Sequence, residues 1–198
     1  MNHPHAHTPE ARRVSDPLAP ESITALLADL VRIPSVNPSI APEEGQDERA
    51  IAGFARAWLE ANGMRAWLEE AAPNRPNVVA EAGTGTPALV LYGHIDTVGT
   101  AGMTIPPHEP RVDEGRLYGR GSTDMKGGVA ACMAAAAALA RERLNGRILL
   151  ALVADEEYES IGAADFVRCR HADAALVSES TQGALILAHK GFVWADLV

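Results

Sequence analysis

Short apolar runs that suit β-strands alternate along this chain with longer runs of helical periodicity. Residues Ile148–Val153 are all apolar, and a strand of that kind is buried on both faces of a sheet. An alanine-rich stretch from about Gly128 to Arg143 precedes it and is expected to be helical. The alternation predicts an α/β fold, with a mixed, largely parallel sheet flanked by helices. The other expected strands cover 64–68, 77–82, 88–92 and 174–177, with a short ribbon at 117–118, and the other expected helices cover 23–31, 51–59 and 161–167.

The two ends of the chain do not share this alternation. Residues 1–19 are rich in proline and show no periodicity, so we expect a disordered tail there. Its alternating histidines, His3, His5 and His7, leave a metal-binding tract as the alternative. At the other end, residues 183–198 are expected to form two more strands.

The charge of the chain excludes several classes of partner. Its net charge is −9 and it has only two lysines, Lys126 and Lys190, whereas binding a polyanion needs clustered Lys and Arg. We therefore expect no nucleic-acid partner and no anionic membrane surface. No apolar stretch reaches about 18 residues and the N-terminus lacks an apolar signal core, which predicts a cytoplasmic protein. Cys132 and Cys169 are expected to be buried free thiols.

Chemistry-bearing residues follow two of the expected strands in turn. His94 and Asp96 come directly after the strand 88–92, and side chains two apart on an extended segment face the same way. A hydrogen-bonded loop pair is the alternative explanation of this motif. Four acidic residues in five positions, at 155–159, follow the strand 148–153 and would repel one another unless a cation compensates. An exposed acidic loop is the alternative there.

Two further acidic residues lie at comparable boundaries. Asp124 stands in the glycine-rich loop GRGSTDMKGG at 119–128, at the start of the alanine-rich helix, where an aspartate that caps the helix is the alternative. A phosphate-binding loop is disfavoured because the order G-x-x-x-x-G-K-[ST] is absent. Glu179 follows the strand 174–177 and says little alone. Taken together, imidazole and carboxylate ligands without cysteine suit Zn²⁺, Co²⁺ or Mn²⁺ in a two-metal centre.

The motifs together resemble a known family of two-metal hydrolases. The strand and GHIDTV motif at 89–98, the loop at 119–128, the acidic triplet Asp155–Glu157 and Glu179 occur in the order seen in acetylornithine deacetylase, succinyl-diaminopimelate desuccinylase, aminoacylase and carboxypeptidase G. The resemblance covers roughly residues 20–198. It implies the N-terminal part of a zinc-exopeptidase-like catalytic domain that cleaves an amide bond of N-acyl amino acids or short peptides.

The resemblance also implies a role for each site residue. His94 and Glu179 would hold one metal ion, Glu157 would hold the other, and Asp124 would bridge the two. Asp96 would orient His94. Glu156 would take a proton from the water that bridges two divalent ions and return it to the leaving amine. The expected ions are Zn²⁺, and Co²⁺ or Mn²⁺ are the alternatives. The peptide bond after Asp124 is expected to be cis.

The chain departs from the family pattern in its length. Family members are about twice as long and carry a lid and dimerisation domain and a late histidine ligand, which His189 does not match. We therefore expect residues 20–190 to be the N-terminal part of the catalytic domain and 191–198 to begin the lid. On this interpretation the segment is an inactive fragment of a homodimeric enzyme. The alternative is a short, non-catalytic, metal-binding relative.

Overall fold

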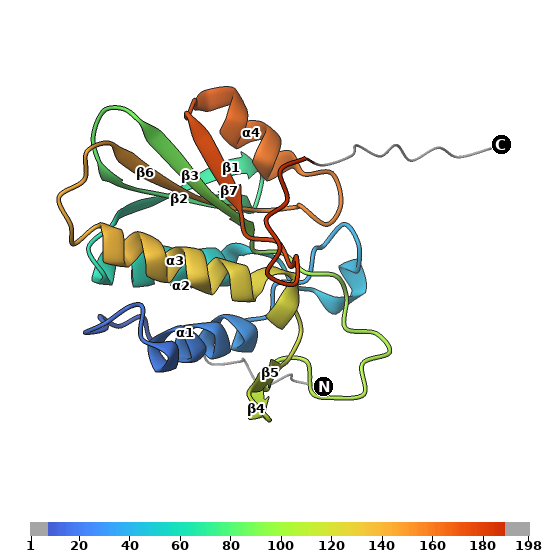
Figure 1. The fold of residues 1–198 in the computed structure, drawn as a ribbon. Coiled ribbons are helices and arrows are strands. Elements are labelled where there is room, and N and C mark those ends of the chain that lie inside the picture. The colour runs from blue at the N-terminus through green and yellow to red at the C-terminus, as the bar shows by residue number, and fades with distance from the viewer. Residues whose placement is uncertain (1–7, 189–198) are drawn as a thin grey trace.

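A five-stranded mixed sheet lies between helices in the computed structural model, which describes residues 8–188 (Figure 1). Pairing is antiparallel between β1 and β2 and between β2 and β6, and parallel between β6 and β3 and between β3 and β7. The predicted mixed α/β sheet is confirmed, with the two kinds of pairing equally represented in the described part. In spatial order the strands are β1 (Arg65–Ala72), β2 (Arg75–Gly83), β6 (Arg147–Val153), β3 (Ala88–His94) and β7 (Ala174–Val177).

Helices cover both faces of this sheet. Helices α2 (Arg49–Ala61) and α3 (Gly127–Leu139) pack on one face, α4 (Ile161–Cys169) packs on the other, and α1 (Pro20–Arg32) lies on the outer side of α3 (Figure 1). The expected ribbon is a hairpin. The remaining short elements are η1 (Pro42–Glu44), η2 (Ser122–Lys126) and the hairpin strands β4 (Arg111–Asp113) and β5 (Arg116–Tyr118).

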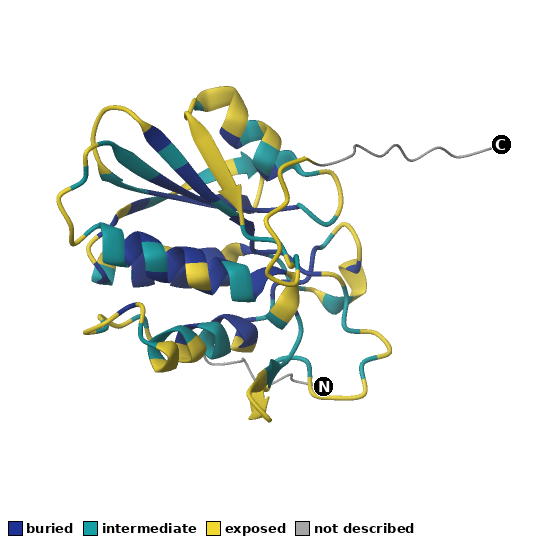
Figure 2. Cartoon of the chain, in the orientation of Figure 1, coloured by how far each residue is buried: buried dark blue, intermediate teal, exposed yellow. Residues whose placement is uncertain are grey.

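The central strand β6 explains why the apolar run in the sequence has no polar alternation. Leu150 and Leu152 pack into the core under α2 and α3, whereas Leu149, Ala151 and Val153 pack under α4. Both faces of the strand are therefore buried, as the dark central band in Figure 2 shows. Because β6 lies between β2 and β3, its C-terminal end is held against the end of β3.

The side chain of Lys126, directly before α3, forms hydrogen bonds with the end of α1. Its side chain is fully buried, and Nζ donates hydrogen bonds to the carbonyl oxygens of Leu30 (3.1 Å) and Ile33 (2.9 Å) at the end of α1. Carbonyls at a helix C-terminus have no partner within the helix, so the ammonium satisfies them. Burial lowers the pKa of Lys126 to about 7. This contact holds the loop that carries Asp124 against α1.

The N-terminal segment lacks helix and strand but is attached to the body from Ala11 onward. Ala11 and Val14 pack against the main core, and the backbone N–H of Val14 donates to Asn62 Oδ1 at 2.9 Å. Arg141 donates to the carbonyl oxygen of Val14 at 2.7 Å. The expected disordered tail is therefore packed over this stretch, because its apolar side chains cover α2 and α3. His3, His5 and His7 lie outside the described residues.

Two expectations from the sequence differ from the structure. Residues 183–188 form no strand, and Leu185, Ile186 and Leu187 are exposed there. The rest of the two expected strands, the lid boundary at 191–198 and His189 lie outside the described residues. Cys132 is buried as expected, but Cys169, the last residue of α4, is exposed.

Gly128 is expected to tolerate no larger side chain. A Cβ atom at this position would lie 2.1 Å from the Ser178 carbonyl oxygen, so α3 or the segment after β7 would have to move. We predict that Gly128→Ala lowers the free energy of unfolding in urea by about 1–3 kcal/mol. Gly53→Ala is the matched control, since its Cβ would meet nothing within 4 Å, and it should be stabilising by up to about 1 kcal/mol. Equal effects of the two substitutions would contradict the packing described here.

Candidate metal centre

The imidazole of His94 is buried at the end of β3 and has one ring nitrogen fixed by its own loop. Nδ1 lies 3.0 Å from the backbone oxygen of Asp96 and 3.4 Å from Asp96 Oδ1. This arrangement favours a proton on Nδ1 and turns Nε2 toward the acidic side chains. Asp96 therefore lies beside Nδ1, on the side of the ring opposite the acidic side chains that Nε2 faces.

The other ring nitrogen of His94 faces carboxylates from three separate segments. Nε2 lies 3.1 Å from Asp124 Oδ1, 3.6 Å from Glu156 Oε2 and 3.6 Å from Glu179 Oε1. Glu156 follows β6, Glu179 follows β7 and Asp124 lies in η2, so neighbouring strand ends and one loop bring them together. The peptide bond between Asp124 and Met125 is cis, as the resemblance implied.

Two sets of three side chains have the spacing that a bound cation requires. Ligand atoms of His94, Glu156 and Glu179 lie within 4.8 Å of one another, and so do those of His94, Asp124 and Glu157. The four residues predicted as ligands therefore lie close together. Glu156, which was predicted as a base and not as a ligand, lies among them. One buried imidazole cannot neutralise four partly exposed carboxylates. This donor set, hard oxygens with one imidazole, fits divalent cations of the Zn²⁺ type.

Burial and charge within the centre displace the pKa values of His94 and of three glutamates. Burial alone would lower the pKa of His94, but the hydrogen bond and charge of Asp96, with the charges of Glu156 and Glu179, raise it to about 10. Burial and the neighbouring carboxylates raise the pKa of Glu157 to about 7, although the charge of His94 opposes this. The pKa values of Glu156 and Glu179 are raised for the same reasons. The residues thus behave as a cluster that lacks positive charge.

Asp96 does more than orient His94. Its Oδ1 accepts the backbone N–H of Glu156 at 3.0 Å, and its Oδ2 accepts the backbone N–H of Glu157 at 3.1 Å. A third donor, Asn37 Nδ2, lies 2.7 Å from Oδ2. Burial would raise the pKa of Asp96, but these hydrogen bonds and the neighbouring imidazole lower it. One carboxylate therefore fixes both the histidine and the two glutamates.

Sequence analysis missed several residues behind the centre. Asn37, Glu48 and Arg75 are buried and form hydrogen bonds that reach Asp96 or Asp155. They come from a loop, the start of α2 and the start of β2, and no motif spacing links them. The one signal available in the sequence was a charged pair, Asp47 and Glu48, directly before an apolar helix. Asp47 does accept a hydrogen bond from the backbone of Arg49.

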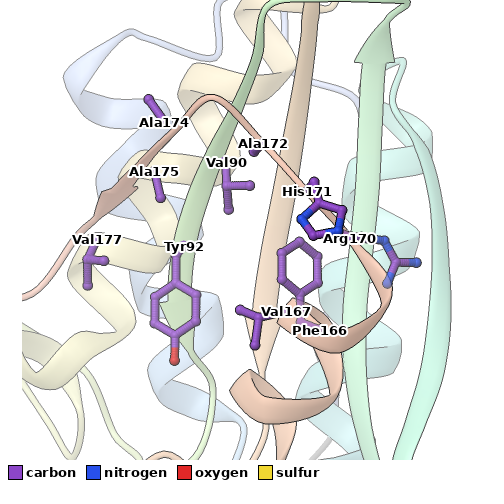
Figure 3. A pocket seen from close by; sticks show the side chains of 10 residues that line it. All are labelled: Val90, Tyr92, Phe166, Val167, Arg170, His171, Ala172, Ala174, Ala175 and Val177. Atoms are coloured by element: carbon purple, nitrogen blue, oxygen red, sulfur yellow. The ribbon is translucent and has the colours of Figure 1, made fainter.

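Two hollows lie near the ends of these strands. A polar one of about 260 Å³ is lined by Thr97, Val98, the loop 119–124 and Glu157, so it opens onto the centre. A larger apolar one of about 380 Å³ lies on the α4 side of β3 and β7. Figure 3 shows Tyr92, Val177 and Phe166 around it. None of the carboxylates described above lines this second hollow, so the polar one is the candidate substrate site.

The fold is a mixed α/β domain with a candidate metal centre at the ends of its parallel strands. Residues 90–189, about half of the chain, match the model of peptidase family M20/M25/M40. The chain belongs to this family, and membership of a metallopeptidase family implies the use of divalent metal ions.

Two curated relatives align with most of this chain. The chain is 35% identical over 154 residues to succinyl-diaminopimelate desuccinylase of Parvibaculum lavamentivorans, an alignment that spans 74% of this chain and 37% of the relative. It is 32% identical over 174 residues to a probable succinyl-diaminopimelate desuccinylase of Staphylococcus aureus, spanning 84% of this chain and 42% of the relative. The chain thus spans about two fifths of the length of these relatives.

Solved structures share the fold. Human carnosine dipeptidase 1 superposes with a TM-score of 0.69 at 23% identity, over 81% of this chain and 38% of that protein. The M20 family metallo-carboxypeptidase Sso-CP2 from Sulfolobus solfataricus gives a TM-score of 0.69 at 23% identity, over 80% of this chain and 37% of that one. At this identity the likeness shows the fold alone. Across residues 8–188, no helix has the length and apolar character needed to cross a membrane.

Metal binding at His94 should release protons. Because the pKa of His94 is raised to about 10, its ring is protonated at pH 7 without metal, whereas a ligand imidazole must be neutral. We predict that Zn²⁺ titrations at pH 7 release about one proton from His94 for the ion that its imidazole binds, and that Zn²⁺ affinity falls as the pH is lowered. Calorimetry in buffers of different ionisation enthalpy measures this release.

The control for this titration is the exposed His171. His171→Ala should leave the proton release unchanged, whereas His94→Ala should weaken Zn²⁺ binding. A binding heat that is the same in every buffer would contradict the assignment of Nε2 as a ligand.

Proposed function

We propose that the chain is the metal-binding part of an amide hydrolase that acts on N-acyl amino acids or short peptides. The observation that carries this proposal is the convergence of Asp124, Glu156 and Glu179 on the single buried nitrogen His94 Nε2. Relatives named as succinyl-diaminopimelate desuccinylases support an N-acyl substrate with an anionic group, and membership of a peptidase family supports a short peptide.

Four residues would hold two metal ions, and the family resemblance implies which residue holds which ion. His94 and Glu179 would serve one ion, Glu157 the other, and Asp124 both. Asp124 is 64% exposed and so has lone pairs free for two partners, which supports its assignment as the bridge. When bound, two divalent cations supply an acidified water and polarise the scissile carbonyl.

Glu156 is the proposed proton carrier of the reaction. Its carboxylate is half-buried near the centre, and its backbone is fixed by Asp96. The raised pKa of Glu156 brings it closer to neutrality, which suits a group that takes a proton from the attacking water and gives it to the leaving amine. The imidazole of His94, whose Nδ1 is held by the backbone oxygen of Asp96, would serve as a metal ligand and would not transfer protons.

A non-catalytic metal-binding protein is the second candidate. The chain spans about two fifths of the length of its curated relatives, so the activity of those proteins comes to this chain only as a proposal. A homodimer and a cytoplasmic location stay predictions. The two candidates differ in turnover but not in metal binding.

Substitution of Glu156 should separate turnover from metal binding. In the complete natural polypeptide loaded with Zn²⁺, Glu156→Ala is expected to lower kcat for an N-succinyl amino acid by about 10²–10⁴-fold, because proton transfer is lost. Metal content, measured by atomic emission, should persist. Glu159→Ala removes an exposed acid from the same turn and is the matched control, with expected activity close to that of the unaltered protein.

Two results would count against this proposal. Unchanged turnover in Glu156→Ala would remove that residue from the mechanism. Absence of turnover in the unaltered protein, with metal bound, on both N-acyl amino acids and dipeptides would favour the non-catalytic candidate.

A further inference from the structure

A chain of buried charged and polar side chains runs from the start of α2 to the metal centre. Glu48 Oε1 and Oε2 accept hydrogen bonds from Arg75 Nη2 (2.6 Å) and Nε (2.9 Å), a bidentate pair. The same Nη2 donates to Asp155 Oδ1 at 2.8 Å. Asn37 Nδ2 then joins Asp155 Oδ1 (3.0 Å) to Asp96 Oδ2 (2.7 Å). Asp96 is the residue that fixes His94, Glu156 and Glu157.

Stability alone is a poor explanation for this network. The side chains of Glu48 and Asp155 are 0% and 2% exposed, and that of Arg75 is 11% exposed. Removing such charges from water costs several kcal/mol per ion, which their attraction only just offsets, so apolar residues would stabilise the site as well. A buried network of this kind holds a defined geometry, and the geometry it reaches is that of the acidic turn.

The turn after β6 is wrapped around Asp155. Asp155 Oδ2 lies 3.3 Å from the backbone N of Glu159, and the carbonyl oxygen of Asp155 accepts the N–H of Ser160 at 2.7 Å. The φ of Asp155 is +65°, a left-handed conformation that is costly for a residue with a Cβ. Surrounding contacts must therefore impose it. Arg75 is the charged partner of the carboxylate that organises this turn.

We infer that Arg75 is a positioning residue for the metal centre, which holds Asp155 so that Glu156 and Glu157 leave β6 facing His94. The inference rests on the proposed function for its consequence in metal binding, but the order of the turn can be measured without it. Arg75 lies at the start of β2 and contacts none of the proposed ligands, so it acts through Asp155 and Asn37.

The test compares Arg75→Met with Arg65→Met. Arg65 lies on β1 with its side chain 75% exposed, paired with Glu81 and over the ring of Trp67, so its loss removes a charge but no buried hydrogen bond. In Arg75→Met, we expect the Kd for Zn²⁺ from calorimetry to rise by about 10–100-fold, the range typical for partners of metal ligands. Amide exchange of residues 155–161 should accelerate while that of residues 149–152 does not. Arg65→Met should change neither quantity.

Conservative variants keep the test decisive if Arg75→Met does not fold. Arg75→Lys retains one charge beside Asp155 without the planar fork, and we expect a smaller rise in Kd than for Met. Glu48→Gln leaves Arg75 bound to Asp155, and an effect of at most a few-fold is expected. A Kd within twofold of the unaltered protein in Arg75→Met or, failing that, Arg75→Lys would overturn the inference.

The exchange data separate this inference from the proposed function. If the unaltered protein binds no Zn²⁺, the proposed function fails, and the exchange of 155–161 alone decides whether Arg75 orders the turn. Faster exchange throughout the sheet together with an unchanged Kd would show that Arg75 is merely structural and would overturn the inference.

Discussion

The structure depends on one electrostatic imbalance, a single buried imidazole surrounded by carboxylates. His94 lies at the end of β3, and the acidic groups reach it from the ends of β6 and β7 and from the loop before α3. In such sheets the carboxyl ends of parallel strands share one edge, so the parallel order β6-β3-β7 is what brings residues 85 positions apart into one cluster. The cluster has an excess of negative charge, which the divalent cations of the proposed function would neutralise.

The apolar parts of the fold serve this edge by making it rigid. Both faces of β6 are buried, Lys126 ties the Asp124 loop to α1, and Gly128 lets the segment after β7 approach α3 closely. On the polar side, Asp96 accepts the backbone N–H groups of Glu156 and Glu157. The acidic side chains thus extend from a fixed backbone, and their repulsion is not relieved by movement of the turn.

Sequence patterns predicted most of the helices and strands because these depend on local spacing, whereas the candidate site residues came from motifs and the family resemblance. The run at 174–177 became β7, and the motifs holding His94, Asp124, Glu157 and Glu179 converge in space. Local patterns failed where the structure depends on contacts with residues that are distant in the sequence. Residues 183–188 have strand-like composition but no neighbouring strand in the described part, and β-propensity depends on such neighbours. Arg75 and Asp155, 80 residues apart, share no motif, so their ion pair was invisible before the fold was known.

The most direct test of the central claim is anomalous X-ray scattering from crystals of the protein grown with Zn²⁺. We predict two peaks at the zinc edge about 3.5–4 Å apart, both in contact with Asp124, one of them bound to His94 Nε2. A structure with Zn²⁺ in excess in which His94 Nε2 has no metal partner, or in which the ions lie away from Asp124, would contradict the account.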